Sequence, residues 1–211
     1  MQSKRVLIAD DHFAIRSGVR SILTDEITDI EFGEATNAAE LFQKIKGEAW
    51  DALILDVNLP DKNGLEILKQ IKSEAIRVPV LVFSMHSEEQ IAVRALRAGA
   101  AGYLCKTSAD FELGKAVNLL LTGRKYITSS VAELLLSHFD ETIEKAAHEL
   151  LSDREYQTLI LIAAGKSVSQ IAAELSLGVP TISTYRARIL EKMRLKNNAE
   201  ITHYVIENRL T

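Results

Sequence analysis

Five polar side chains stand where short apolar runs end in the first half of the chain. They are Asp10 and Asp11 after the run from Arg5, Asp56 at the end of DALILD, Ser84 at the end of VPVLVFS, and Lys106 at the end of AGYLCK. Buried strands of a parallel sheet end on one edge, where open α/β proteins keep their chemistry. We therefore expect these five side chains to converge, although an isolated strand-end aspartate would simply be solvated.

The types of these residues indicate phosphoryl chemistry. Crowded carboxylates repel one another unless a cation compensates them, and hard oxygen ligands of this kind suit Mg²⁺. A lysine and a hydroxyl make poor magnesium ligands, but they suit a transferring phosphoryl group, whose charge and oxygens they can bind. With no better nucleophile in reach, Asp56 would accept the phosphoryl group as an acyl phosphate.

The elements that would position these residues alternate strictly along the first 122 residues. The apolar runs that predict strands are residues 5–10, 30–36, 51–56, 78–84 and 101–106, and the segments between and after them carry apolar residues at helical spacing. Asn37 and Glu40 have the spacing of a helix cap. Five strands alternating with five helices predict a doubly wound α/β domain, a parallel sheet covered on both faces.

A different pattern follows residue 122. Residues 123–148 predict a partly helical linker, whose apolar stripe at 131–136 is either linker packing or a dimer contact. Beyond it the apolar period is 3.6 throughout, with cap spacings at Ser152 and Glu155 and at Ser167 and Gln170. The predicted helices span residues 152–164, 167–175, 179–194 and 198–208. The second and third are separated by a tight turn carrying Gly178, which is the helix-turn-helix arrangement.

Composition excludes several classes of protein. With 211 residues, of which 47% are apolar and 26% charged, the chain is typical of a globular protein rather than a disordered one. Its single cysteine, Cys105, excludes an internal disulfide and a cysteine metal cluster. No apolar run approaches the ~20 residues that span a bilayer, and acids come too early for a signal peptide, so we expect a cytoplasmic protein with no membrane partner.

At this point the sequence resembles a known family. VLIADDH, LILDVNLPDKNGLE, VLVFSM and GAAGYLCKT look like the four signature stretches of a response-regulator receiver domain. LSDREYQTLILIAAGKSVSQIAAELSLGVPTISTYRARILEKM resembles the LuxR-type helix-turn-helix, and the order is that of NarL/FixJ-type regulators. The resemblance implies a flavodoxin-like or CheY-like (βα)5 receiver at 1–122, a linker at 123–148 and a small all-α DNA-binding domain at 149–211.

The resemblance also implies roles for individual residues. Asp56 would be the phosphoacceptor, and Ser84 and Lys106 would contact the phosphoryl group. Mg²⁺ would be held by Asp10, Asp11, Asp56 and the backbone carbonyl of Asn58. Tyr103 falls where the family has a rotating aromatic that acts with Ser84 as a switch, although it can also be read as a packed strand aromatic. The implied partners are a sensor histidine kinase, double-stranded DNA, a second copy of the chain after phosphorylation, and RNA polymerase as a further candidate.

The helix beginning near Val179 is the candidate DNA-reading helix. Its buried stripe is predicted at Ile182, Tyr185, Ile189 and Met193. The opposite face, which would enter the major groove, consists of Ser183, Thr184, Ala187 and Arg188. Relatives often carry lysine at the position of Ser183, so base readout should rest more on Arg188 and on methyl contacts. Phosphates would be held by Lys166, Thr181, Arg186 and Lys192.

The sequence therefore indicates a phosphorylation-controlled, DNA-binding transcriptional regulator. It would not be an enzyme, beyond promoting its own phosphotransfer and slow dephosphorylation. One alternative is a haloacid-dehalogenase-like phosphohydrolase, whose pattern needs an acid where this chain has Asn58. The other is a regulator whose receiver no longer accepts phosphate, against which the intact set of acids, serine and lysine argues.

Overall fold

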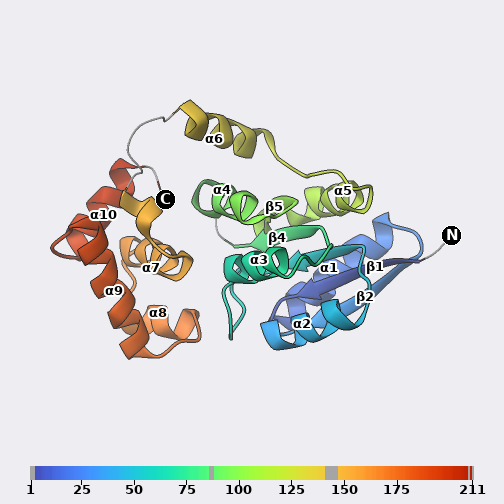
Figure 1. Cartoon of the computed structure of the whole chain (residues 1–211), viewed down its shortest axis with the longest axis horizontal. Coiled ribbons are helices and arrows are strands. Elements are labelled where there is room, and N and C mark those ends of the chain that lie inside the picture. Colours follow the sequence, from blue (N-terminus) through green and yellow to red (C-terminus); the bar gives the residue numbers. More distant parts are fainter. Residues whose placement is uncertain (1–2, 86–87, 141–146, 209, 211) are drawn as a thin grey trace. The chain divides into compact units, whose positions relative to one another are not determined.

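The computed structural model describes residues 3–85, 88–140, 147–208 and 210. Its Cα packing divides the chain into two compact units, Met1–Leu135 and Leu136–Thr211. The first contains a parallel sheet and its helices, and the second is helical over its described residues (Figure 1). Each unit has a hydrophobic core of its own. Among the described helices, none is long and apolar enough to cross a membrane.

The sheet of the first unit has five parallel strands in the order β2-β1-β3-β4-β5. The strands are β1 (Lys4–Ala9), β2 (Ile30–Ala35), β3 (Ala52–Leu55), β4 (Val80–Ser84) and β5 (Gly102–Cys105). This confirms the predicted doubly wound parallel sheet. The predicted strands extend one or two residues further at some ends, because the apolar pattern does not show where ladder pairing stops.

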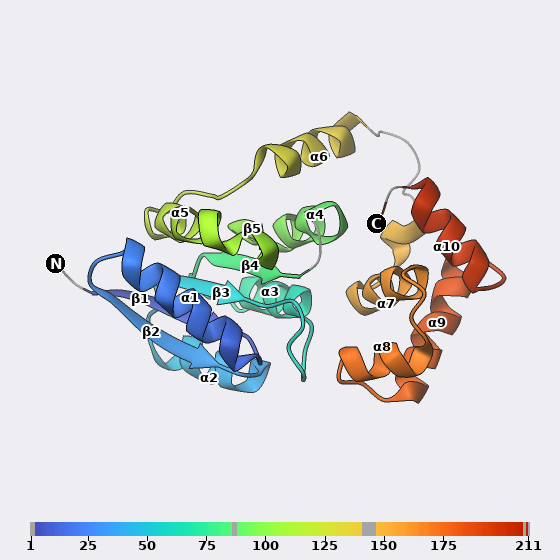
Figure 2. The same ribbon diagram turned by 180° about the vertical axis from the view of Figure 1, so that it is seen from behind.

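Five helices cover the two faces of this sheet. They are α1 (Phe13–Glu26), α2 (Ala38–Gly47), α3 (Gly64–Ser73), α4 (Glu88–Ala98) and α5 (Ala109–Leu121). Helices α2, α3 and α4 lie on the face seen in Figure 1, and α1 and α5 on the face seen in Figure 2. Side chains alternate along a strand, so Leu53 and Leu55 pack with the first group while Ile54 packs with the second.

The start of the linker is part of the first unit. The backbone N–H of Tyr126 donates to the Ala101 carbonyl at 2.9 Å, and its phenol donates to Glu112 Oε2 at 2.6 Å. Val131, in α6 (Ser129–Asp140), is 1% exposed and belongs to the same core cluster as α3 and α4. The apolar stripe at 131–136 is therefore packed at its start, although Leu136 is 65% exposed.

The second unit contains the predicted helix-turn-helix. Its elements are the short 3₁₀ helix η2 (Ala147–Leu150), α7 (Asp153–Ala163), α8 (Val168–Glu174), α9 (Val179–Met193) and α10 (Asn198–Glu207). Ser152 and Ser167 both form complete capping boxes, as their spacings predict. The left-handed residue in the turn before α9 is Ser176, with φ 52°, whereas Gly178 has an extended φ of −72° and caps α9.

Candidate functional site

Two carboxylates and a lysine meet at the carboxyl edge of the sheet. Asp10 follows β1, Asp56 follows β3, and Lys106 begins the 3₁₀ helix η1 (Lys106–Ser108) after β5. The Lys106 ammonium lies 2.6 Å from Asp10 Oδ2 and 3.0 Å from Asp56 Oδ2. All three side chains are at most 5% exposed. Three of the five side chains expected to converge therefore meet, in a buried setting.

The acids can hold a divalent ion. Asp10, Asp11, His12 and Asp56 each offer a ligand atom, and these atoms lie within 4.8 Å of one another. Asp56 Oδ1 is buried and has no hydrogen-bond partner among the described residues. A buried oxygen without a partner is costly, and coordination to a hard cation such as Mg²⁺ would satisfy it. The donor set therefore fits the expected ion. Within it, His12 Nδ1 lies 2.7 Å from Asp11 Oδ1.

The charges of this pocket do not balance. Burial raises the pKa of the Asp56 carboxyl group. Lys106 and the Asn58 backbone N–H lower this pKa and Asp10 raises it, and the net pKa lies above the ordinary value. Burial lowers the pKa of Lys106, but the two carboxylates outweigh it and leave that pKa raised, so the lysine stays charged. When both carboxyl groups are ionised, two buried carboxylates face one ammonium, and a bound cation would compensate the excess negative charge.

The loop after β3 is packed against the phosphoacceptor candidate. Gly64 donates its N–H to the Val57 carbonyl at 2.8 Å, and Asn58 pairs with Asn63 across the loop. A Cβ atom at Gly64 would lie 2.7 Å from the Asp56 carbonyl oxygen and 2.7 Å from Val57 Cα. Only glycine fits this approach of two backbone segments, so Gly64 helps to place Asp56.

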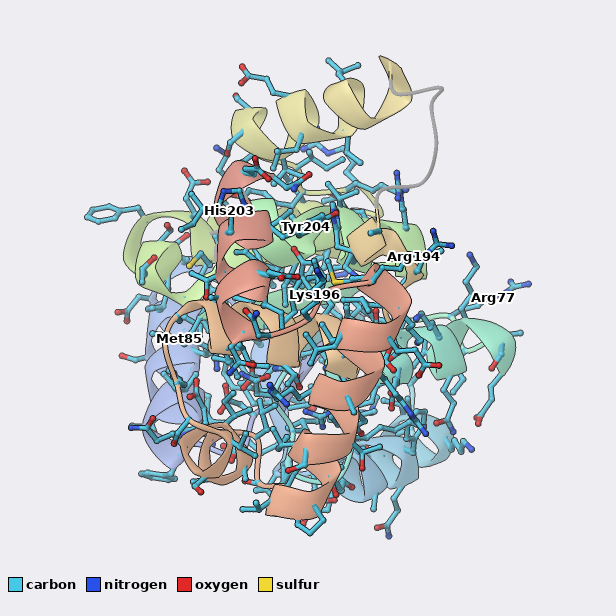
Figure 3. The ribbon with its side chains drawn as sticks, turned by 90° about the vertical axis from the view of Figure 1, so that its left-hand side faces the viewer. Arg77, Met85, Arg194, Lys196, His203 and Tyr204 are labelled. Carbon is cyan, nitrogen blue, oxygen red and sulfur yellow. The ribbon has the colours of Figure 1, made fainter. Side chains whose placement is uncertain are left out.

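The two switch candidates are both buried. Ser84 ends β4 with no exposed surface, and Tyr103 in β5 is 1% exposed and packs in the core cluster that includes α3 and α4 residues. Tyr103 therefore occupies the position of a packed strand aromatic in this structure. Met85, which follows Ser84, is 63% exposed (Figure 3).

Sequence reasoning missed Arg16 and its partner Glu34. Arg16 lies in α1 and donates to the Asp10 carbonyl at 2.8 Å and to Glu34 Oε2 at 2.8 Å. The sequence did hold a signal for Arg16. It falls at helical spacing from Val19 and Leu23, and the three side chains share the buried face of α1. An arginine on the core face of a helix is buried only when its charge and donors are matched.

The reading face expected for α9 is open to solvent. Ile182 and Ile189 have no exposed surface, Met193 is 6% exposed, and Tyr185 is half-buried against the same core. The exposed side chains are Ser183, Thr184, Ala187 and Arg188. The Thr184 hydroxyl donates to the Pro180 carbonyl at 3.0 Å, so its methyl group is the part left for a base contact.

The candidate phosphate contacts have partners within the protein. Lys192 Nζ lies 2.5 Å from Oε2 of Glu155, a side chain that is 2% exposed, and Arg186 Nε donates to Asn198 Oδ1 at 2.6 Å. Lys166 pairs with Glu174, and Thr181 is half-buried. Each cation would have to share or exchange its partner to bind a phosphate. Sequence reasoning left out Arg194 and Lys196, which are exposed beyond the end of α9 (Figure 3).

Comparison with known proteins assigns both units to families. Residues 6–118 match the response regulator receiver domain, and residues 149–205 match the bacterial regulatory proteins of the luxR family. Response regulator UvrY of Escherichia coli (strain K12) is 31% identical over 206 residues, which cover 97% of this chain and 94% of the relative. Response regulator GacA of Pseudomonas syringae pv. syringae (strain B728a) is 31% identical over 198 residues, covering 93% of this chain and 92% of the relative.

A solved structure contains the same two domains in the same order along the chain. RcsB from Salmonella enterica serovar Typhimurium, bound to promoter rprA in the presence of the phosphomimetic BeF₃⁻, is 25% identical with a TM-score of 0.64, covering 96% of this chain and 98% of that one. These matches decide against the phosphohydrolase, because the family consists of transcription regulators. The chain belongs to the response regulators of the NarL/FixJ type, phosphorylation-controlled regulators of transcription in which a receiver domain is joined to a LuxR-type helix-turn-helix domain.

Proposed function

We propose that Asp56 accepts a phosphoryl group from a sensor histidine kinase, and that this reaction controls self-association and DNA binding. The observation that carries the proposal is the buried, unpartnered Oδ1 atom of Asp56, which lies in the ligand group with Asp10 and Asp11. Mg²⁺ would be held by Asp10, Asp11, Asp56 and the Asn58 carbonyl, where it would offset the charge of the phosphoryl oxygens.

The pocket residues divide the chemistry between them. An Asp56 carboxylate oxygen forms a bond to phosphorus while the bond from phosphorus to the donor breaks, and the donor leaves with that electron pair. Lys106, already 3.0 Å from Asp56 Oδ2, would bind a phosphoryl oxygen and stabilise its charge. Ser84 would donate its hydroxyl to another oxygen. The product is an acyl phosphate, which water slowly hydrolyses.

Incubation with a small phosphodonor tests this proposal. Intact-mass spectrometry of the whole chain should detect a single phosphate adduct in the presence of Mg²⁺ and none after chelation of the metal. Absence of any adduct would identify a receiver that no longer accepts phosphate, and release of many phosphates per chain without an adduct would identify a hydrolase.

Phosphorylation is expected to promote self-association. Ser84 ends β4 and Lys106 follows the neighbouring strand β5, so a phosphoryl group bound by both would pull them together and change the surface around α4 and β5. Tyr103, which is packed beside this region, would act with Ser84 in that change. Sedimentation of the chain with and without phosphodonor should show a larger mass for the phosphorylated form. An unchanged mass together with unchanged DNA affinity would contradict this role.

We further propose that α9 reads the major groove of DNA. Its exposed face presents an arginine and methyl groups, which are suited to guanine and thymine edges. Pro180 stands in its first turn, where a missing N–H costs nothing and the neighbouring free N–H groups can face a phosphate. A dimer would read an inverted or direct repeat, with half-sites about one helical turn apart.

Replacement of Arg188 by alanine should relax sequence preference. A bidentate arginine contact to a base is lost, so affinity for the specific site should fall by about 1 to 3 kcal/mol, while affinity for scrambled DNA changes little. Binding titrations on matched and scrambled duplexes at a single salt concentration measure both effects. Equal losses on the two duplexes would make Arg188 a backbone contact instead.

Replacement of Lys192 by alanine should have two separable effects. Loss of a phosphate contact weakens binding to all DNA sequences alike and flattens the salt dependence. The variant also leaves the buried Glu155 carboxylate without its ammonium partner, which should lower the stability of the helix-turn-helix domain. The loss should be only about 1 kcal/mol, because solvent at the exposed lysine weakens the ion pair. Thermal unfolding and salt-dependent DNA binding separate the effects. Lys192→Ala combined with Glu155→Gln should recover stability but not DNA affinity.

The remaining partners follow from this role. The phosphodonor would be the phosphohistidine of a sensor kinase, and the site of action would be the cytoplasm, where DNA is accessible. RNA polymerase is a further candidate partner, which a pull-down of the phosphorylated, DNA-bound chain would test.

A further inference from the structure

The buried guanidinium of Arg16 contacts the backbone of Asp10, the first of the two adjacent acids Asp10 and Asp11. The Arg16 side chain is 10% exposed, and its Nη1 donates to the backbone carbonyl of Asp10 at 2.8 Å. Its Nε donates to Glu34 Oε2 in β2, also at 2.8 Å. The planar, forked guanidinium can hold these two directions at once, which a lysine ammonium on a shorter stem cannot reproduce.

The backbone of Asp10 is fixed on both sides. Its N–H donates to the Ala35 carbonyl at 3.1 Å, which extends the β1–β2 ladder by one residue. Its carbonyl accepts the Arg16 guanidinium. That carbonyl belongs to the peptide plane between Asp10 and Asp11, so its direction determines where both side chains begin. Loss of the Arg16 contact would allow this plane to rotate and would shift two carboxylates at once.

Glu34 reduces the electrostatic contribution of Arg16 to the pocket. Its second oxygen accepts from Arg20 Nη1 at 2.8 Å, and the hydrogen bonds from Arg16 and Arg20 lower the pKa of its carboxyl group. An ionised Glu34 shares its single negative charge between Arg16 and the solvent-exposed Arg20, so it offsets part of the charge that Arg16 brings to the pocket. The other effect of Arg16 is to fix the orientation of the Asp10 carbonyl.

We infer that Arg16 is a positioning residue for divalent metal binding, which holds the Asp10–Asp11 peptide plane so that both carboxylates face the ion beside Asp56. The inference rests on the proposed function, because it concerns the same pocket. A purely structural role, in which Arg16 only ties α1 to β2, is the competing explanation. It predicts loss of folded protein, whereas positioning predicts weaker metal binding by fully folded protein.

Calorimetric titration of the whole chain with Mg²⁺ separates these explanations, because it reports the dissociation constant and the number of sites independently. Arg16→Lys should raise the dissociation constant about tenfold, the scale of lost ligand support, while the stoichiometry stays at one ion. Saturating Mg²⁺ should then restore the wild-type extent of phosphorylation. A structural role would instead lower the number of sites and leave the dissociation constant unchanged.

Arg20 provides the matched control. It lies one turn further along α1 and pairs with the same carboxylate, but it is 52% exposed and donates to no group of Asp10 among the described contacts. Arg20→Ala should bind Mg²⁺ as the wild type does. Equal shifts in the two variants, or a wild-type constant for Arg16→Lys, would overturn the inference.

A second variant serves if Arg16→Lys does not fold. Glu34→Gln keeps Arg16 and removes the charge that orients it, so it should raise the dissociation constant in the same direction by a smaller factor. An unchanged constant in this folded variant would also overturn the inference. Failure of the wild-type chain to bind Mg²⁺ at all would instead contradict the proposed function, so the two failures are distinguishable.

Discussion

Asp56→Asn should abolish phosphorylation and make the metal-free protein more stable. The amide lacks the nucleophilic oxygen charge, and it removes a carboxylate whose burial is poorly compensated. The pKa of Asp56 is higher in the folded protein than in the unfolded chain, where it is near 4. Ionisation of Asp56 therefore lowers the stability of the wild type as the pH rises above about 4, and the stability advantage of Asp56→Asn over the wild type should grow from acid to neutral pH. At neutral pH we expect a gain of about 1 to 3 kcal/mol. Urea unfolding with and without Mg²⁺, beside intact-mass spectrometry, measures both effects.

Asp61→Asn is the matched control for this prediction. Asp61 lies in the same loop, but its carboxylate accepts from the first N–H groups of α2, at 2.7 Å from Ala38 N and 3.1 Å from Ala39 N. This control should take up phosphate like the wild type and gain no stability. A phosphate adduct on Asp56→Asn would move the acceptor to another residue, and a less stable Asp56→Asn would mean that the Lys106 contact outweighs the burial cost.

Gly64→Ala should damage both the fold and the phosphorylation site. The added Cβ would lie 2.7 Å from backbone atoms of Asp56 and Val57. Backbone atoms cannot relieve such a clash by changing rotamer, as a flexible side chain can. We expect a loss of about 1 to 3 kcal/mol from overpacking. Displacement of Asp56 should slow phosphorylation about 10- to 100-fold, because sub-ångström positions matter in phosphoryl transfer. Unfolding curves and time courses with a small phosphodonor measure the two effects.

Gly18→Ala controls for the loss of a glycine as such. Gly18 lies on the exposed face of α1, and a Cβ there would have no atom within 4 Å. Alanine is the better helix residue, so this variant should gain about 0.5 to 1 kcal/mol and keep the wild-type phosphorylation rate. If Gly64→Ala behaved like Gly18→Ala, the loop after β3 would be able to move without disturbing Asp56.

Local patterns in the sequence were sufficient to predict the strands and helices and the meeting of three charged residues at one edge of the sheet. Apolar runs and helical stripes indicated five strands and five helices. Because a parallel sheet places the ends of its strands on one edge, the sequence alone predicts that Asp10, Asp56 and Lys106 lie together. The start of α2 was predicted at Asn37, whose side chain accepts a hydrogen bond from the Glu40 backbone N–H. These signals act within a few residues or follow from topology alone.

Tertiary structure alone decided the contacts that join distant residues. Arg16 reaches Glu34, and Lys192 reaches Glu155, because packing brings their elements together, and no local pattern names such a partner. The turn before α9 bends at Ser176 rather than at Gly178, since the backbone path between two packed helices overrides the preference for glycine at positive φ. The start of the 131–136 stripe, at Val131, is buried in the receiver core because α6 packs there, whereas Leu136 at its end is exposed; hydrophobicity alone could not tell these two positions apart.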